Sequence, residues 1–210
     1  WETMVSDHHG RAALLEGELA LDAEGRFIGL RVRWTCNAGA YLSQPGPLIN
    51  TLNPASHAIN VYRIPALYGR HLLALTNTTS TTAYRGAGRP NVAYLVERLV
   101  DEAARELDID RTELRRINFI PKEAFPYKTP VGSIYDSGDP AGEFEEVLDK
   151  SDWADFETRR RQSASRGKLR GKGETPAWHR RWPDFQGVGL LPDGLSLELV
   201  PTGCEAGQRG

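Results

Sequence analysis

The run AYRGAGRP, residues 83–90 of this 210-residue chain, has the residue types of a ligand-binding loop. Gly86 and Gly88 can take positive φ angles and carry no side chains, so their backbone N–H groups can approach an anion or an oxygen ligand. Arg85 adds a permanently charged fork that suits a carboxylate, phosphate or enolate oxygen. A helix predicted to begin at Pro90 places its positive dipole end at the same point. The run therefore predicts a loop that binds an oxygen-bearing or negatively charged group.

A plain glycine turn with a surface arginine also explains this run, because short glycine motifs are weak signals. The run lacks the lysine and hydroxyl of a phosphate-binding P-loop, and its glycine spacing differs from the dinucleotide-binding fingerprint. A free-standing nucleotide-binding module built on Gly86 and Gly88 is therefore disfavoured. The residues alone leave the binding loop and the plain turn open.

Other reactive side chains lack the neighbours that a site requires. His8 and His9 are adjacent in an extended stretch and so point in opposite directions, and no cysteine or third histidine is near them in sequence. Cys36 falls on the apolar face of an expected strand, which predicts a buried, inert thiol. Glu97 and Asp101 are interpreted as charges on a helix face, not as a paired acid and base.

The elements ahead of the run are expected to form a sheet. Residues 16–36 hold two apolar runs around a hairpin turn at residues 22–25. Residues 37–69 carry four prolines and predict a long irregular connection, and residues 70–79 predict a strand that leads into the run. The second apolar run alternates as a half-buried strand does, through Ile28, Leu30, Val32, Trp34 and Cys36.

Helices are predicted after Pro90, which suits a first helical turn because its missing N–H costs nothing there. Glu97, Asp101 and Arg105 fall outside the apolar stripe of this helix. The stripe itself consists of Val92, Val96, Leu99, Ala103 and Leu107.

Three further helix starts are visible in the sequence. Asp110 with Glu113 forms a start like a capping box, and the helix that follows should end before Pro121. Asp139 and Ser151 are start signals for two more helices.

The last quarter of the chain differs from the rest in composition and in periodicity. Residues 163–187 are basic, glycine-rich and aperiodic, which predicts a linker. Its run from Trp178 to Trp182 mixes cations with aromatic rings, as nucleic-acid-binding segments do, but a loop explains it better in a nearly neutral chain. Arg159–Arg161 is interpreted as a solvated helix end. The class is α+β, with a first domain over 1–162, the linker, and the start of a second domain over 188–210.

Composition limits the functional classes. A hydrophobic content of 40% and a charged content of 26% are typical of a globular protein. The net charge of −2 gives no basic field for nucleic acid, and no apolar run approaches the roughly 20 residues of a membrane span. Two distant cysteines, Cys36 and Cys204, suit a reducing, cytoplasmic location. The first residue, Trp1, and the glycine-rich last residues suggest a fragment of a longer protein.

Four stretches together resemble a known family. GAYLSQPGP, TNTTSTTAYRGAGRP, AYLVERLVDEAARELDIDRTELRRINFIP and FPYKTPVGSIYDSGD are similar, in this order, to the molybdenum-binding large subunit of the xanthine dehydrogenase/aldehyde oxidase family. The similarity is greatest to its bacterial branch of carbon-monoxide-dehydrogenase-like subunits and spans residues 1–171. It implies a molybdopterin-binding domain in which helices pack on a mixed sheet.

The resemblance implies a molybdopterin-dependent oxidoreductase that acts on a small molecule. Such enzymes hold molybdenum on a pterin, here expected in the cytosine dinucleotide form, and hydroxylate an aldehyde or an N-heterocycle with oxygen from water. Electrons pass to an iron–sulfur small subunit and an FAD medium subunit, and the complete protein is expected to be a dimer of heterotrimers. The cofactor supplies the difficult chemistry, and protein groups position the substrate.

The resemblance also assigns roles within the loop. Arg85 matches the family arginine on the substrate side of the metal and is the expected catalytic residue. The backbone of Gly86, Ala87 and Gly88 is expected to bind the cofactor. In members that oxidise CO, a cysteine that bridges to copper follows this arginine, whereas Gly86 offers no thiolate to a soft metal. Hydroxylation is therefore expected rather than CO oxidation.

The carboxyl end resembles the family less. Gly207 and Gln208 are expected to contact the pterin through amide hydrogen bonds, but Arg209 stands where the family has glycine. The family's catalytic glutamate is expected beyond Gly210, and another glycine-rich loop before Trp1. The chain alone is thus expected to be inactive, and the alternative to an enzyme part is a truncated remnant that binds no cofactor.

Overall fold

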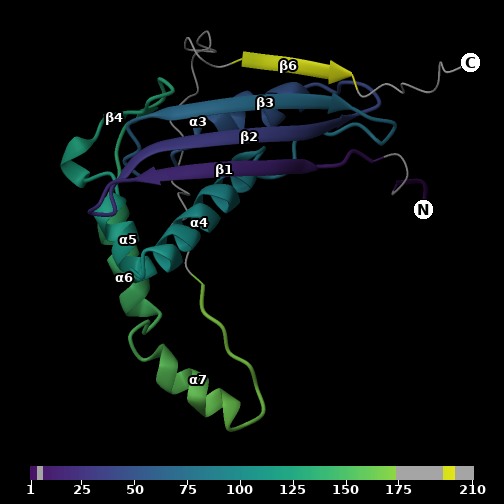
Figure 1. The fold of residues 1–210 in the computed structure, drawn as a ribbon. Coiled ribbons are helices and arrows are strands. Elements are labelled where there is room, and N and C mark those ends of the chain that lie inside the picture. The colour runs from purple at the N-terminus through teal and green to yellow at the C-terminus, as the bar shows by residue number, and fades with distance from the viewer. Residues whose placement is uncertain (4–6, 174–195, 202–210) are drawn as a thin grey trace, which may run out of the picture.

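A mixed sheet lies at the centre of the protein in the computed structural model, which describes residues 1–3, 7–173 and 196–201. Strand β1 is antiparallel to β2, whereas β2, β3 and β6 run parallel to one another. Helices α3 and α4 cover one face of this sheet (Figure 1). This arrangement confirms the α+β class. In spatial order, the strands are β1 (Ala13–Leu21), β2 (Phe27–Gly39), β3 (Leu67–Leu75) and β6 (Ser196–Pro201).

The parallel pairing of β2 and β3 brings two distant loops together. The chain leaves both strands at the same edge of the sheet. There the Ala40 N–H donates to the Thr78 carbonyl at 2.9 Å, and the Thr76 N–H donates to the Gly39 carbonyl at 3.0 Å. Residues 40–50 and 76–88 are thus neighbours.

The predicted hairpin of β1 and β2 is confirmed, with one error in its inward face. Leu30, Val32, Trp34 and Cys36 are buried, but Ile28 is 49% exposed. A bulge causes this difference, because Ala20 pairs with Gly29 and Leu21 pairs with Phe27, which leaves Ile28 as the extra residue. Phe27 takes the inward position in its place.

The connection between β2 and β3 is more regular than the prolines suggested. It contains two short helices, α2 (Gly46–Asn50) and α3 (Leu52–Ser56), so the prediction of a wholly irregular segment is wrong. The prolines do not break these helices, because Pro45 and Pro54 occupy a cap and a first turn. Strand β3 is confirmed, although it begins and ends earlier than predicted.

Helix α4 (Arg89–Glu106) follows the loop as predicted, but its buried face is rotated from the predicted stripe. Leu95 and Val100 are buried together with Val92 and Val96, whereas Leu107 caps the end of the helix and is 46% exposed. The face turned because α4 packs on both β1 and α5 (Arg111–Asn118).

Two of the three later helices begin at the predicted cap residues, and the third does not. Asp110 accepts hydrogen bonds from the N–H groups of Thr112 and Glu113 ahead of α5. Asp139 accepts from the Gly142 N–H ahead of α6 (Pro140–Lys150). Ser151 was predicted to start a helix, but it ends α6, and α7 (Phe156–Ala164) begins after Asp155.

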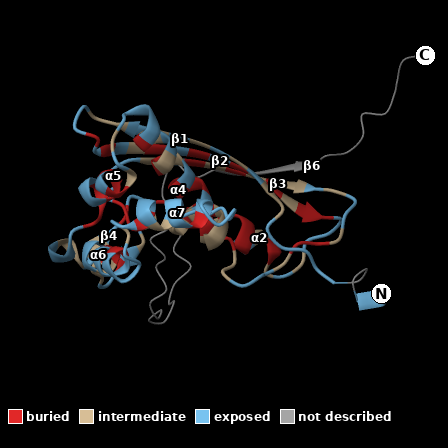
Figure 2. Cartoon of the chain, turned by 90° about the horizontal axis from the view of Figure 1, so that it is seen from below, coloured by how far each residue is buried: buried red, intermediate tan, exposed pale blue. Residues whose placement is uncertain are grey.

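The remaining elements lie away from the sheet. They are the 3₁₀ turn η1 (Lys122–Ala124) and a small hairpin of β4 (Tyr127–Lys128) and β5 (Ile134–Tyr135). Figure 2 shows buried residues along the sheet and in α2, whereas α6 and α7 carry much exposed surface. No helix within the described ranges is long and apolar enough to cross a membrane.

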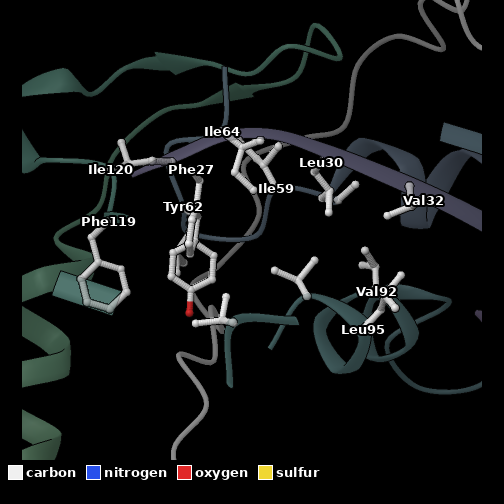
Figure 3. Packing of buried hydrophobic residues seen from close by; sticks show 14 of the residues in the cluster. Phe27, Leu30, Val32, Ile59, Tyr62, Ile64, Val92, Leu95, Phe119 and Ile120 are labelled. Carbon is white, nitrogen blue, oxygen red and sulfur yellow. The ribbon is translucent and has the colours of Figure 1, made fainter. Parts of the chain in front are cut away.

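The core lies between the sheet and α4 (Figure 3). Side chains of β2 face a segment that follows α3 and the buried face of α4, and aromatic rings close one end, where Tyr62 and Phe119 stack at 5.7 Å between centroids. The residues shown are Phe27, Leu30, Val32, Ile59, Tyr62, Ile64, Val92, Leu95, Phe119 and Ile120.

A buried ion pair joins α4 to α5. Arg115 is 0% exposed and donates to Glu97 at 2.8 Å and to Asp101 at 2.9 Å. The Tyr62 hydroxyl donates to Glu97 at 2.9 Å. The interpretation of Glu97 as a plain helix-face charge is therefore wrong, because a buried arginine on the next helix requires its carboxylate.

Candidate functional site

The predicted loop is a tight turn in an unusual backbone conformation. Three successive residues have positive φ angles: 95° at Gly86, 45° at Ala87 and 89° at Gly88. The Ala87 N–H donates to the Tyr84 carbonyl at 2.7 Å, and the Arg89 N–H donates to the Gly86 carbonyl at 3.0 Å. The glycines are needed here because residues with a Cβ rarely take this conformation.

Close packing adds a second reason for Gly88. A Cβ at this position would lie 2.2 Å from the Ile49 carbonyl oxygen and 3.0 Å from Pro54 Cδ. At Gly86 a Cβ would meet Pro90 Cγ at 2.7 Å. The loop is thus seated on α2 and α3, and Gly88 is also the N-cap of α4.

The loop contains three donors that no described residue uses, on the exposed Arg85, the half-buried Gly86 and the buried Gly88. The N–H groups of Gly86 and Gly88 donate no hydrogen bond to any described residue. The guanidinium of Arg85 is exposed and has no hydrogen-bond or ion-pair partner within the described ranges. The first N–H groups of α4, by contrast, are taken by loop carbonyls, because those of Asn91 and Val92 donate to Gly88. The donor set suits an oxygen-rich anionic ligand.

Helix α3 supports the loop from one side. The Asn53 side-chain amide donates to the Ala87 carbonyl at 2.7 Å. His57 lies one turn further on, with Nδ1 at 2.8 Å from the Asn53 carbonyl, and Arg89 Nε donates to His57 Nε2 at 3.5 Å. Burial lowers the pKa of His57 to about 4, and the charge of Arg89 acts in the same direction. His57 is therefore a neutral ring at pH 7, with a proton on Nδ1 and an acceptor at Nε2.

Arg11 supports the loop from the other side. Its guanidinium donates to the Arg85 carbonyl. It also stacks on the ring of Tyr84, 4.5 Å from the ring centroid. Sequence reasoning missed Arg11, Asn53 and His57, because Arg11 is 74 positions from its partner and the other two lie in a segment interpreted as irregular. The four-residue spacing of Asn53 and His57 is the one signal that could have placed them on a helix face.

A network of hydrogen bonds surrounds Thr81, directly ahead of the loop. Asn50 donates to Thr81 Oγ1 at 3.0 Å, and that hydroxyl donates to the Asn37 carbonyl at 2.8 Å. The Ser43 hydroxyl donates to the Thr81 carbonyl at 2.6 Å. Segments after β2 and β3 are fastened together by these bonds, directly ahead of the glycines.

The other candidates lie outside the glycine loop, although His9 pairs with Thr81 directly ahead of it. His8 and His9 are exposed, and no group of three His, Cys, Asp or Glu that could hold a metal occurs in the described part of the chain. Cys36 is buried, and burial raises the pKa of its thiol to about 12, which confirms an inert thiol. Gly207 and Gln208 lie outside the described residues, as does most of the predicted second domain.

Comparison with known proteins gives a consistent result. The model of the family described as molybdopterin cofactor-binding domain matches residues 1–119. The chain is 31% identical over 207 residues to the 6-hydroxypseudooxynicotine dehydrogenase complex subunit gamma of Paenarthrobacter nicotinovorans, covering 96% of this chain and 24% of that protein. It is 33% identical over 207 residues to the carbon monoxide dehydrogenase large chain of Hydrogenophaga pseudoflava, covering 93% of this chain and 26% of that protein.

A solved structure shows the same similarity in three dimensions. Quinoline 2-oxidoreductase from Pseudomonas putida 86 superposes with a TM-score of 0.73 at 28% identity, over 79% of this chain and 21% of that one. The chain thus spans about a quarter of the length of the curated relatives that it matches.

Proposed function

Because this chain belongs to the molybdopterin cofactor-binding domain family, we propose that it forms part of the large subunit of a molybdenum hydroxylase. The resemblance drawn from the glycine loop is confirmed at the level of the family. The activity, substrate and partners of the whole enzyme are proposed here, since the relatives are about four times as long.

The loop fits the cofactor of this family. Free N–H groups at Gly86 and Gly88 and the free guanidinium of Arg85 are donors for an anionic, oxygen-bearing group. The residues proposed to hold the cofactor are Gly86, Ala87 and Gly88, together with Gly207 and Gln208.

The chain's own residues then have distinct tasks. When bound, the cofactor supplies the redox chemistry that adds oxygen from water to an electron-poor carbon. The N–H groups of Gly86 and Gly88 donate hydrogen bonds to an oxygen of the bound group. Arg85 orients the substrate by donating to an oxygen or ring nitrogen, and it stabilises negative charge that develops there. His57 stays neutral and moves no proton at neutral pH.

An N-heterocycle is the substrate class that we favour, with an aldehyde as the second. Gly86 provides no thiolate for copper, so a copper-dependent oxidation of CO is not supported by the residue at that position. One relative is named for quinoline, which is an N-heterocycle.

The proposed assembly follows the names of the relatives, which are a complex subunit gamma and a large chain. We assign an iron–sulfur small subunit and an FAD medium subunit as partners in a dimer of heterotrimers, with the cofactor in its cytosine dinucleotide form. Residues 1–162 form a first cofactor-binding domain, 163–187 a linker and 188–210 the start of a second, whose strand β6 extends the sheet of the first, in a cytoplasmic enzyme.

The test uses the complete enzyme that contains this chain. Molybdenum is measured per large subunit, and turnover of quinoline and of an aromatic aldehyde is followed with an artificial electron acceptor. Arg85→Ala is expected to lower kcat/KM about 100-fold, because one preorganised donor at developing charge contributes on that order. Arg33→Ala, which removes an exposed arginine from β2, is the matched control and should leave kcat/KM unchanged. No molybdenum in the intact assembly would contradict the proposal and favour the inactive remnant.

A further inference from the structure

We infer that Arg11 and Asn53 are positioning residues that orient the two free N–H groups of the loop, each through the carbonyl on the same peptide plane. This inference rests on the proposed function, since it concerns the same loop. It adds two residues that neither the loop's sequence nor the comparisons assign.

The first plane joins Ala87 to Gly88. The peptide unit is planar and trans, so the Ala87 carbonyl and the Gly88 N–H point in opposite directions from one rigid plane. Asn53 holds this carbonyl at 2.7 Å. With the carbonyl directed to α3, the Gly88 N–H is directed away from α3 and cannot turn to another partner.

The second plane joins Arg85 to Gly86. Its carbonyl accepts a hydrogen bond from the Arg11 guanidinium, which the Tyr84 ring keeps in place 4.5 Å from the ring centroid. The Gly86 N–H is fixed by the same geometry. Two side chains on opposite sides of the loop thus set the two donors independently.

These anchors are needed because the backbone between them is strained. Ala87 has a Cβ and a φ of 45°, a conformation that is unfavourable for a residue other than glycine. Without the Asn53 bond, the Ala87–Gly88 plane is free to rotate toward a relaxed turn, and its N–H rotates with it. His57 in turn stabilises the position of Asn53, because its Nδ1–H donates to the Asn53 carbonyl at 2.8 Å.

The experiment compares two variants with two matched controls in the complete enzyme. Arg11→Met and Asn53→Leu remove one donor each while keeping the size of the side chain. Arg31→Met removes an exposed arginine of β2, and Ser133→Ala removes a donor to the Ser56 carbonyl of α3, so neither control touches the loop.

Three readouts are expected to separate the variants from their controls. Molybdenum loss on dialysis is about tenfold faster in each variant, since one hydrogen bond contributes roughly that factor. Turnover falls in kcat with KM unchanged, because the N–H groups contact the bound group and not the free substrate. Hydrogen exchange at Ala87 and Arg89, whose N–H groups close the turn, is faster in the variants with or without molybdenum.

The outcomes distinguish this inference from the proposed function. If both variants match their controls in exchange and in molybdenum retention, while the unaltered enzyme holds molybdenum, the positioning inference is overturned and the function stands. If the unaltered enzyme holds none, the function fails, and the exchange rates at Ala87 and Arg89 still decide whether the two side chains hold the loop.

Discussion

Gly88 shows at the scale of one residue how a backbone constraint and a packing constraint coincide. Its φ of 89° disfavours any side chain, and the Ile49 carbonyl occupies the place of a Cβ. Gly167 has a positive φ of 68° as well, but nothing lies within 4 Å of its missing Cβ. Comparing substitutions at the two glycines therefore separates the free-energy cost of backbone strain from that of overpacking.

Gly88→Ala is expected to destabilise the protein by about 2–5 kcal/mol, the sum of left-handed strain and overpacking. Gly167→Ala carries the strain alone and should cost about 1–2 kcal/mol. Urea unfolding of the two variants, followed by circular dichroism, measures the difference. Equal costs would contradict the close approach of Gly88 to Ile49.

The residues of the site divide into those the sequence could predict and those it could not. Arg85 and the glycines were predicted because their types are local and adjacent. Arg11 and Asn53 were not, because they lie 74 and 34 positions from the carbonyls that they hold. A hydrogen bond to a backbone carbonyl leaves no sequence pattern, since every residue has such a carbonyl.

At the scale of elements, the link between α4 and α5 depends on charges that a helical pattern does not reveal. Glu97 is 6% exposed, and burial raises the pKa of its carboxyl, whereas Arg115 acts to lower it. The sequence placed both helices correctly from their caps and spacing. The role of Glu97 was predicted wrongly because its partner lies on the next helix. The bulge at Ile28 was not predicted because the register of a strand depends on the opposite strand.

Glu97→Leu is expected to cost about 3–5 kcal/mol, because it removes the buried carboxylate that pairs with the charged and buried Arg115. The double variant Glu97→Leu with Arg115→Met should be more stable than the single variant, since the buried guanidinium is then gone and the carboxylate that loses its partner, Asp101, is partly exposed. Glu102→Gln on the same helix removes an exposed ion pair with Arg105 and should change stability by less than about 1 kcal/mol. Denaturant unfolding of the unaltered protein and these three variants measures the differences; a double variant no more stable than Glu97→Leu would refute this account.

At the scale of the whole molecule, a buried histidine, His71, and a half-buried one, His57, link stability to acid. His71 is 1% exposed and stacks on Trp34 at 4.3 Å, and among the described residues neither of its ring nitrogens nor Trp34 Nε1 has a hydrogen-bond partner. Burial lowers the pKa of His71 to about 4, and the Asn50 backbone acts in the opposite direction with a smaller effect. His57 has a pKa of about 4 for the same main reason.

Stability is therefore expected to fall as the pH drops from about 6.5 to about 4. In this window the unfolded chain takes up protons on both histidines and the folded chain does not, so protonation favours unfolding. Each histidine lowers the free energy of unfolding by up to roughly 3 kcal/mol across this window, at 1.36 kcal/mol for each unit of pKa shift. The raised pKa of Glu97 has the opposite effect on stability. The free energy of unfolding in urea between pH 4 and 7.5 measures the slope. His71→Phe should flatten it; an unchanged slope would show that His71 does not contribute.

The anchors of the glycine loop also bear on how the chain acquires its site during synthesis. The residues that hold the loop are Arg11, Asn37, Ser43, Asn50, Asn53 and His57, and all precede the loop in the chain. A ribosome that adds about 5–20 residues per second therefore delivers the loop to partners that are already made. Helix α4 follows next and packs against β1, which was made before it. The order of translation and the order of assembly thus agree in this part of the protein.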